Sequence, residues 1–316
     1  MSGDMSYTTE EIAKLLKISK LTVYDLIKKG ELPSYRVGKQ MRVDAVDLEA
    51  YKQRAKGVSY QEKAQSVVLP AQVIDAPAPV GVRRLVITGQ DIGLDLLTKQ
   101  IEKQVPGTRA LRAYAGSLDS LISMYRGEAD IVSTHLLDGD TGEYNLPYIR
   151  KLLVGAPYVV VNLLSREAGM FVQEGNPLGL RTWGDLGKPN IRLVNRERGS
   201  GARVLLDEQL RLHGIAAEGI AGYDTEESNH LGVAGKVASG AADVGVGTAR
   251  AATIVGNVDF VPLIKERYDL VMLKRPENKG WIEAVLRVLR SDALREELGA
   301  IGGYDLSLTG RIMADT

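Results

Sequence analysis

Several short loops in residues 83–316 carry the residue types that bind anions. They pair glycine with serine or asparagine just before helical patterns, at Gly116-Ser117, Gly199-Ser200-Gly201 and Ser228-Asn229. The first turn of a helix leaves backbone N–H groups without intrahelical partners, at the positive end of the helix dipole. Glycine lets a ligand approach the backbone, and serine adds a hydroxyl donor. We therefore expect these loops to face a small anion.

Other candidate ligand-binding residues lie in neighbouring loops and at strand ends. Arg203, in the first turn of the helix after Ser200, is expected to supply the charge that fixes a tetrahedral oxyanion. The remaining candidates are Gly89, Asp91, Thr134, His135 and Thr248. A carboxylate such as Asp91 repels an anion unless it caps the next helix or accepts a ligand hydroxyl, so it equally indicates an organic ligand.

Each of these loops also has a purely structural interpretation. Serine is a common helix N-cap and glycine a common turn residue, so for any single loop that explanation is the simpler one. The agreement of several loops in two halves of the segment is what favours a ligand site.

No set of residues in the sequence indicates catalysis. The GxGxxG, P-loop and HExxH patterns are absent, and no recognisable order of Ser, His and Asp stands out. His135 and His230 lie beside donor positions, but hydrogen-bonded histidines are more common than metal ligands, and the chain has three histidines. We expect a protein that is not an enzyme, with no catalytic residues, no metal site and no cofactor.

The overall composition excludes several classes of protein. The 316 residues hold 40 Lys and Arg against 40 Asp and Glu, so no net field attracts the whole chain to nucleic acid or a membrane. The lack of cysteine excludes disulfides and thiolate metal sites. The first residues carry no secretion signal, and the longest apolar stretch, LLVGAPYVVVNLL, is too short to cross a bilayer. We expect a cytoplasmic protein with no membrane partner.

Three segments differ in charge and periodicity. Residues 1–57 hold 11 Lys and Arg against 8 Asp and Glu, so the excess basic charge is local. Residues 58–82 lose periodicity and contain three prolines, which is typical of a linker. Residues 83–316 alternate β-branched runs with helical patterns, which predicts an α/β fold with parallel strands.

The segment 1–57 has the pattern of a winged helix-turn-helix. Thr8 and Glu11 form a potential capping box, Ser19 is the expected N-cap of a second helix, and Gly30 is its expected end. A β-hairpin is expected around Gly38-Lys39-Gln40, followed by a helix capped by Asp44. The expected DNA-binding residues are Ser19, Lys20, Thr22, Tyr24, Lys28, Arg36, Lys39, Gln40 and Arg42.

The segment 83–316 contains one pattern twice. Each copy reads as serine cap, amphipathic helix, glycine stop and a buried strand opened by Ala-Asp, and the stops Gly127 and Gly240 are 113 residues apart. This offset is far longer than a solenoid repeat, so two similar α/β lobes are the simplest explanation. The apolar runs 158–164 and 268–273 are expected to cross between the lobes, with a ligand cleft between them.

Both segments resemble known families. The stretch YTTEEIAKLLKISKLTVYDLIKKGELPSYRVGKQMRVDAVDLEAY is similar to the excisionase-type, MerR-related winged helix-turn-helix, which implies binding of double-stranded DNA. The phrases GSLDSLISMYRGEADIVSTHLLD, NRERGSGARVLLDEQL and NHLGVAGKVASGAADVGVGTA resemble the type II periplasmic-binding-protein fold, and more narrowly the domain linked to molybdate and tungstate sensing. Ala202 stands where relatives commonly have threonine, which leaves one hydroxyl contact missing.

The resemblances imply a one-component transcriptional regulator that binds operator DNA and senses a small oxyanion, molybdate or tungstate. A homodimer is expected, because one small winged helix offers little specific contact area. Two alternatives stay open: a sensor of a small organic acid, and an enzyme or carrier domain of molybdenum-cofactor metabolism with a DNA-binding appendage. For residues 1–57 alone, a basic helical domain that binds protein is the alternative.

Overall fold

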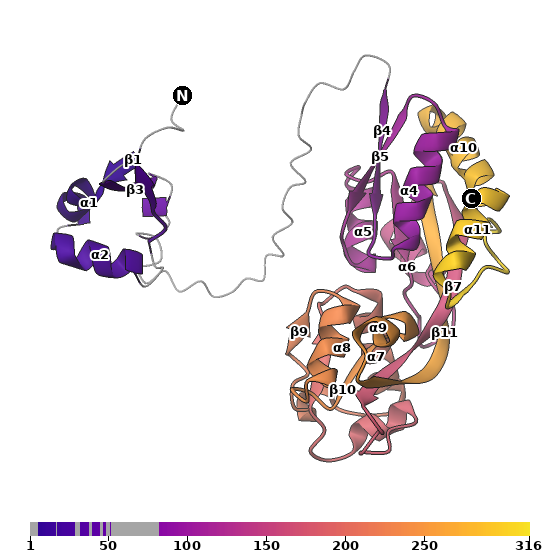
Figure 1. Cartoon of the computed structure of the whole chain (residues 1–316). Helices are drawn as coiled ribbons and strands as arrows, with labels where there is room; N and C mark the ends of the chain where they lie inside the picture. Colours follow the sequence, from indigo (N-terminus) through magenta and orange to yellow (C-terminus); the bar gives the residue numbers. More distant parts are fainter. Residues whose placement is uncertain are drawn as a thin grey trace. The chain divides into compact units, whose positions relative to one another are not determined.

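The computed structural model describes residues 6–16, 18–28, 32–37, 40–44, 47–48, 51 and 82–316 (Figure 1). Lys17, Gly30 and Lys39 lie outside the described residues, as do residues 58–81 of the expected linker. The chain divides into two compact units, Met1–Gln72 and Val73–Thr316.

Within its described residues, the N-terminal unit has two short helices and a small antiparallel sheet, and residues 47, 48 and 51 are helical as well. Its elements are β1 (Ser6–Thr8), α1 (Thr9–Leu16), α2 (Lys20–Lys28), β2 (Tyr35–Val37) and β3 (Gln40–Asp44), with strand order β1-β3-β2. The expected hairpin is confirmed, since Arg36 pairs with Met41 between β2 and β3. Strand β1 is an addition that the sequence pattern did not predict, and it pairs Tyr7 with Val43.

Local hydrogen bonds start both helices at the predicted residues. The Glu11 carboxylate accepts from the Thr8 backbone N–H at 2.7 Å, and Thr8 Oγ1 accepts from the Glu11 N–H at 3.4 Å, so the capping box is confirmed. Ser19 Oγ accepts from the Thr22 N–H at 3.1 Å and caps α2. Leu15 of α1 is 50% exposed, because a domain this small covers only a narrow face of the helix.

The C-terminal unit is a two-lobed α/β structure, and this confirms the predicted fold class. Its first lobe contains β4 (Arg83–Thr88), α4 (Gly93–Gln104), β5 (Thr108–Ala113), α5 (Ser117–Tyr125), β6 (Ile131–Thr134), α6 (Leu146–Leu152), η3 (Pro276–Asn278), α10 (Lys279–Leu289), α11 (Asp292–Ile301), β12 (Tyr304–Asp305) and β13 (Ile312–Asp315). Its second lobe contains η1 (Trp183–Gly187), β8 (Leu193–Arg196), α7 (Gly201–Leu212), η2 (Ala217–Gly219), β9 (Glu226–Glu227), α8 (His230–Ala238), β10 (Val244–Thr248) and α9 (Ala249–Val255).

Two long strands, β7 (Tyr158–Gln173) and β11 (Val258–Leu273), run through both lobes side by side (Figure 1). Together with the strands of the lobes they form a sheet of order β5-β4-β6-β11-β7-β10-β8-β9, in which β12 and β13 also pair with β7. The run 158–164 begins β7 and the run 268–273 ends β11. Both runs belong to the first lobe, because β13 pairs with β7 at 159–161 and β6 pairs with β11 at 269–272.

The repeated sequence pattern performs the same structural task in both lobes. Gly127 and Gly240 end their helices with positive φ of 78° and 74°, which glycine adopts without strain. The aspartate of each Ala-Asp pair then ties its strand to the neighbouring one. Asp130 Oδ2 accepts from the Val86 N–H at 2.8 Å, and Asp243 Oδ2 accepts from the Arg192 N–H at 2.9 Å.

The predicted serine caps of these two helices are wrong. The N-cap of α5 is Gly116, and Ser117 is the first helical residue, whose hydroxyl accepts from the His135 N–H at 3.3 Å. The N-cap of α8 is Asn229, whose side chain accepts from the Gly232 N–H at 2.9 Å. Ser117 is therefore used for a tertiary contact between α5 and the end of β6.

A buried arginine holds the two crossing strands together. Arg166 of β7 is the register partner of Glu266 of β11, and its Nε donates to Glu266 Oε1 at 2.5 Å. A second nitrogen of the same guanidinium donates to Asp91 Oδ2, in the loop before α4. Arg166 is 7% exposed and Glu266 is 1% exposed. Burial opposes ionisation of Glu266, but the positive charge of Arg166 and the contact with His135 outweigh it and hold its pKa below the usual range.

We predict that Arg166→Met lowers the free energy of unfolding by about 3–5 kcal/mol, because it leaves the Asp91 and Glu266 carboxylates buried without a counter-charge. Urea denaturation of the full chain measures the loss. Arg198→Met is the matched control, since Arg198 pairs with Asp224 and both side chains are exposed, so its removal changes stability little. Adding Asp91→Asn and Glu266→Gln to Arg166→Met should restore part of the loss. Equal effects of the Arg166 and Arg198 variants would contradict this account.

Candidate ligand-binding cleft

A cavity of about 600 Å³ lies between the two lobes of the C-terminal unit. The structure brings most of the expected ligand-binding residues to its wall: Gly89, Asp91, Ser117, His135, Ser200, Gly201, Ser228, Asn229 and Thr248. Two expected residues, Thr134 and Arg203, are not among those that line it. A volume of this size is typical of pockets that bind small molecules.

The lobes contact each other around the cavity. The Leu118 N–H of the first lobe donates to the Gly199 carbonyl of the second at 3.0 Å. The Gln90 side-chain carbonyl accepts from the Arg196 guanidinium at 2.7 Å. A Cβ on Gly201 would come within 2.3 Å of the His135 ring, so only glycine allows the lobes to approach this closely there. The two lobes are therefore in direct contact beside the cavity.

Helix starts supply neutral donors to the cavity wall. Ser117, Gly201 and His230 are the first residues of α5, α7 and α8, so their backbone N–H groups lie in the first turn and have no intrahelical acceptor. The Ser117 and Ser200 hydroxyls each accept from a backbone N–H, of His135 and Arg203 respectively, which leaves each O–H free to donate. These donors can bind a small anion without adding a net charge.

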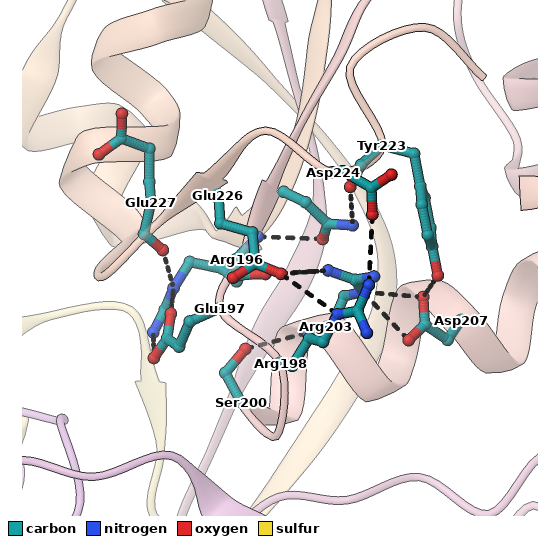
Figure 2. A network of polar contacts seen from close by, with 11 residues as sticks. Arg196, Glu197, Arg198, Ser200, Arg203, Asp207, Tyr223, Asp224, Glu226 and Glu227 are labelled. Atoms are coloured by element: carbon teal, nitrogen blue, oxygen red, sulfur yellow. Dashed lines mark hydrogen bonds and ion pairs between the residues drawn. The ribbon is translucent and has the colours of Figure 1, made fainter. Parts of the chain in front are cut away.

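Arg203 does not supply the charge expected of it. Its guanidinium lies among Asp207, Tyr223 and Glu226 (Figure 2), and Arg203 does not line the cavity. The Nε lies 3.0 Å from Asp207 Oδ1, one terminal nitrogen lies 3.1 Å from Glu226 Oε1, and the guanidinium stacks over the Tyr223 ring at 4.3 Å. The side chain of Arg203 is thus fully used inside the second lobe, and the prediction that it faces the ligand is wrong.

Thr134 also points elsewhere. Its hydroxyl donates to Asn145 Oδ1 at 3.2 Å, and the side chain is fully buried. Asn145 in turn accepts from the Leu136 N–H at 2.7 Å and donates to Asp269 Oδ2 at 2.8 Å. Thr134 therefore belongs to a network that fixes the loop after β6, and it does not donate to the cavity. Its counterpart Thr248, at the end of β10, does line the cavity.

Three arginines that the sequence analysis did not select line the cavity: Arg166, Arg196 and Arg250. The charge of Arg166 is balanced by two carboxylates, and that of Arg196 by the adjacent Glu197 at 2.7 Å. None of the ion pairs in the described part of the chain involves Arg250, whose guanidinium donates to the Ile301 carbonyl at 2.8 Å. Arg250 is half-buried and is the best-placed residue to offer its charge to an anion.

Sequence position gives a partial signal for these arginines. Arg196 ends β8, and Arg250 follows Thr248 by two residues, so both lie at the carboxyl ends of parallel strands, where ligand sites in open α/β sheets gather. Arg166 has no such signal, because it stands in the middle of a 16-residue strand. Only the pairing of β7 with β11 and the approach of the Asp91 loop reveal its role.

Asp91 is a structural residue of the cleft. Oδ1 accepts from the Gly93 N–H at 2.6 Å, at the start of α4, and from the Tyr304 hydroxyl at 2.8 Å, while Oδ2 accepts from Arg166. Both oxygens are therefore engaged by the protein. The carboxylate neutralises part of the Arg166 charge and supports the backbone of the loop that it belongs to.

The two histidines of the cavity have different environments. His135 Nδ1 lies 3.2 Å from Glu266 Oε2, and its ring stacks on Tyr268 at 5.2 Å. His230 Nδ1 is buried without a hydrogen-bond partner among the described residues. Burial, reinforced by the positive charges of Arg196 and Arg166, lowers the pKa of His230 well below its ordinary value, so its imidazole is neutral at physiological pH. In the described part of the chain, no three His, Asp or Glu side chains are grouped to hold a metal ion.

The N-terminal unit presents part of the expected DNA-binding surface. Lys20, Tyr24 and Lys28 are exposed on α2, although Lys20 forms an ion pair with Glu10 of α1. In the hairpin Arg36 is exposed, whereas Arg42 is partly buried and donates to Ser6 Oγ at 3.1 Å. Ser19 and Thr22 are exposed and share a 2.8 Å hydrogen bond at the start of α2. Lys39 and the side chain of Gln40 lie outside the described residues.

This geometry defines a class of protein, in which a winged helix-turn-helix is joined to a two-lobed domain with a ligand-sized cavity. Comparison with protein families agrees, since residues 6–56 match the family described as a helix-turn-helix domain and residues 98–290 match the PBP superfamily domain. The chain belongs to the PBP superfamily and carries an N-terminal helix-turn-helix domain.

Individual relatives share this architecture or this fold. The chain is 48% identical over 316 residues to the protein YvgK of Bacillus subtilis (strain 168), covering 100% of both. A peroxide-bound mutant of Corynebacterium glutamicum OxyR superposes with a TM-score of 0.51 and 12% identity, over 93% of this chain and 90% of that one. The sulfate-binding protein SubI of Mycobacterium tuberculosis H37Rv superposes with a TM-score of 0.50 and 14% identity, over 70% of this chain and 86% of that one. The likeness to these two structures shows the fold alone.

No described helix is both long and apolar enough to cross a membrane.

We predict that the stability of the protein decreases as the pH falls below about 6.5, in part because of His230. An unfolded histidine takes up a proton there, whereas the folded, desolvated His230 does not. His230 therefore lowers the free energy of unfolding by up to about 1.4 kcal/mol for each unit by which the pH falls in this range. Urea denaturation at pH 7.5 and 5.5 measures it, and His230→Gln should remove this part of the pH dependence. His213→Gln, at the end of α7 outside the cavity, is the control, and equal pH dependence in wild type and His230→Gln would refute the prediction.

Proposed function

We propose that this protein is a one-component transcriptional regulator that acts in the cytoplasm. In this proposal the N-terminal unit binds operator DNA, and the cleft of the C-terminal unit binds a small anion that changes operator affinity. The observation that carries it is that helix N-termini, serine hydroxyls and Arg250 all line one cavity, and that no described carboxylate pairs with Arg250. The same protein also has a helix-turn-helix domain. The same domain composition supports a role without catalysis.

Two classes of anion are candidates for the effector. Molybdate and tungstate are the first, because the sequence of the C-terminal segment resembles domains linked to sensing of these oxyanions. A small organic acid is the second, and the cavity volume of about 600 Å³ favours it, since a bare tetrahedral oxyanion fills only a minor part of that space. Both classes would use the donors of Ser117, Ser200, Gly201 and Arg250.

The effector can act through the closure of the cleft. Bound between the lobes, it stabilises the contacts of Gln90 with Arg196 and of Leu118 with Gly199 that link them. Such binding changes DNA affinity only to the extent that the effector prefers one state of the protein over the other. We expect the protein to bind DNA as a homodimer, because contacts to two half-sites multiply the affinity of a small DNA-binding domain.

We predict that an effector at about 100 times its Kd raises the free energy of unfolding of the full chain by about 2.7 kcal/mol. Arg250→Met should weaken binding by about 10- to 150-fold, the range for one charged hydrogen bond, and Ser117→Ala should weaken it less. Calorimetric titration with molybdate, tungstate, sulfate, phosphate and small organic acids provides the Kd values. Arg295→Met is the control, because Arg295 also donates to a backbone carbonyl, that of Thr309, but lies outside the cavity. If no anion changes either the melting temperature or operator affinity, the proposal is wrong.

We predict that the protein binds duplex DNA with an affinity that decreases steeply with salt, as phosphate contacts require. An operator is selected from random duplexes with the full chain, and its Kd is measured from about 50 to 200 mM salt. Arg36→Ala should weaken binding to all DNA sequences alike and reduce the slope of log affinity against log salt concentration by about 1. Tyr24→Ala on α2 should instead change the preferred DNA sequence. Arg181→Ala, an exposed arginine of the C-terminal unit, should change neither. Sedimentation of the complex should give two copies per operator, and binding that does not depend on salt would exclude this interface.

A further inference from the structure

The mouth of the cavity carries apolar side chains that a bare oxyanion does not need. Ile92, Tyr114, Leu231 and Ile254 line the cavity although they are 45%, 70%, 44% and 57% exposed. We call these four residues the apolar collar. Large apolar side chains exposed together on a soluble domain indicate a binding surface more often than single ones do.

The collar is built from both lobes. Ile92 precedes α4 and Tyr114 follows β5 in the first lobe, whereas Leu231 lies in the first turn of α8 and Ile254 in the last turn of α9 in the second. The polar donors of Ser117, Gly201 and His230, at the starts of helices, line the same cavity. The lining of the cavity thus combines hydrogen-bond donors with apolar surface.

Tyr114 is held in place by its own side of the cavity. The Arg112 guanidinium lies 5.2 Å from the centre of the Tyr114 ring. Arg112 is itself fixed, because it donates to Asp95 Oδ1 at 2.8 Å and to the Gly89 carbonyl at 3.0 Å. A ring supported on one face and 70% exposed is a preformed platform for a planar group.

We propose that the ligand of this cleft is an organic anion with a planar, apolar body. Its anionic group is bound by the helix-start donors and Arg250, and its body lies against the apolar collar, with one face on Tyr114. The inference rests on the proposed function, because it names the chemical class of the effector at that same site. It explains why the cavity is far larger than a four-oxygen ion and why the collar residues come from both lobes.

The test compares anions that differ only in their apolar body. The full chain is titrated by calorimetry with inorganic phosphate and phenyl phosphate, with acetate and benzoate, and with molybdate and tungstate. We expect the aryl member of at least one pair to bind about 10-fold tighter or more than its bare partner, because its ring removes collar surface from water. Tyr114→Ala and Ile254→Ala should each reduce that advantage about 5- to 10-fold while changing the Kd of the bare anion less than about 2-fold.

Matched variants separate this inference from the proposed function. Tyr125→Ala is the control for Tyr114, because Tyr125 is 67% exposed on α5 and does not line the cavity. Arg250→Met should weaken the binding of the aryl anions and of the bare anions by the same factor. If molybdate or tungstate binds tighter than every organic probe and collar variants change no Kd, the inference is overturned and the proposed function stands. If no probe binds and operator affinity never responds, both are overturned. Collar variants that alter only sedimentation assign the collar to a protein interface and also overturn it.

Discussion

The C-terminal unit depends on the charge balance of Arg166. This arginine stands where β7 passes between the lobes, with Glu266 opposite it on β11 and Asp91 reaching it from the first lobe. A guanidinium removed from water needs a counter-charge, and each carboxylate here needs the guanidinium in turn. One interaction therefore fixes the register of the two crossing strands and the position of the Asp91 loop. The Tyr304 hydroxyl, bonded to Asp91, extends the same network to β12.

This balance also decides which groups of the cleft are left for the anion that we propose as its ligand. Arg166 and Arg196 line the cavity, yet their charges are already matched by Asp91, Glu266 and Glu197. What remains for a ligand is mostly neutral: helix-start N–H groups and hydroxyls, with Arg250 as the cation that no described carboxylate compensates. Fixed dipoles of this kind discriminate by geometry, because they favour an anion only where its oxygens meet the donors. Such a site fits the anion-sensing function that we propose.

The residues of the N-terminal unit illustrate how far local rules reach. The capping box of Thr8 with Glu11 and the cap at Ser19 each join residues three positions apart, so sequence spacing alone predicted them. The hairpin from Tyr35 to Asp44 followed from alternation around a glycine turn for the same reason. Strand β1 was not predicted, because its pairing with β3 joins Tyr7 to Val43, and no local pattern encodes a partner that distant.

By itself the sequence determined the two-domain organisation, the two-lobed α/β class and the loops that meet in the cleft, since caps, glycine stops and strand patterns are local or repeated signals. Only the tertiary structure decided which side chains of those loops face the cavity. Arg203 turned inward because Asp207, Tyr223 and Glu226 surround it, and Thr134 turned toward Asn145. Arg250 and the apolar collar came to the cavity instead. Side-chain direction depends on partners that are distant in the chain, and a single sequence does not record those distances.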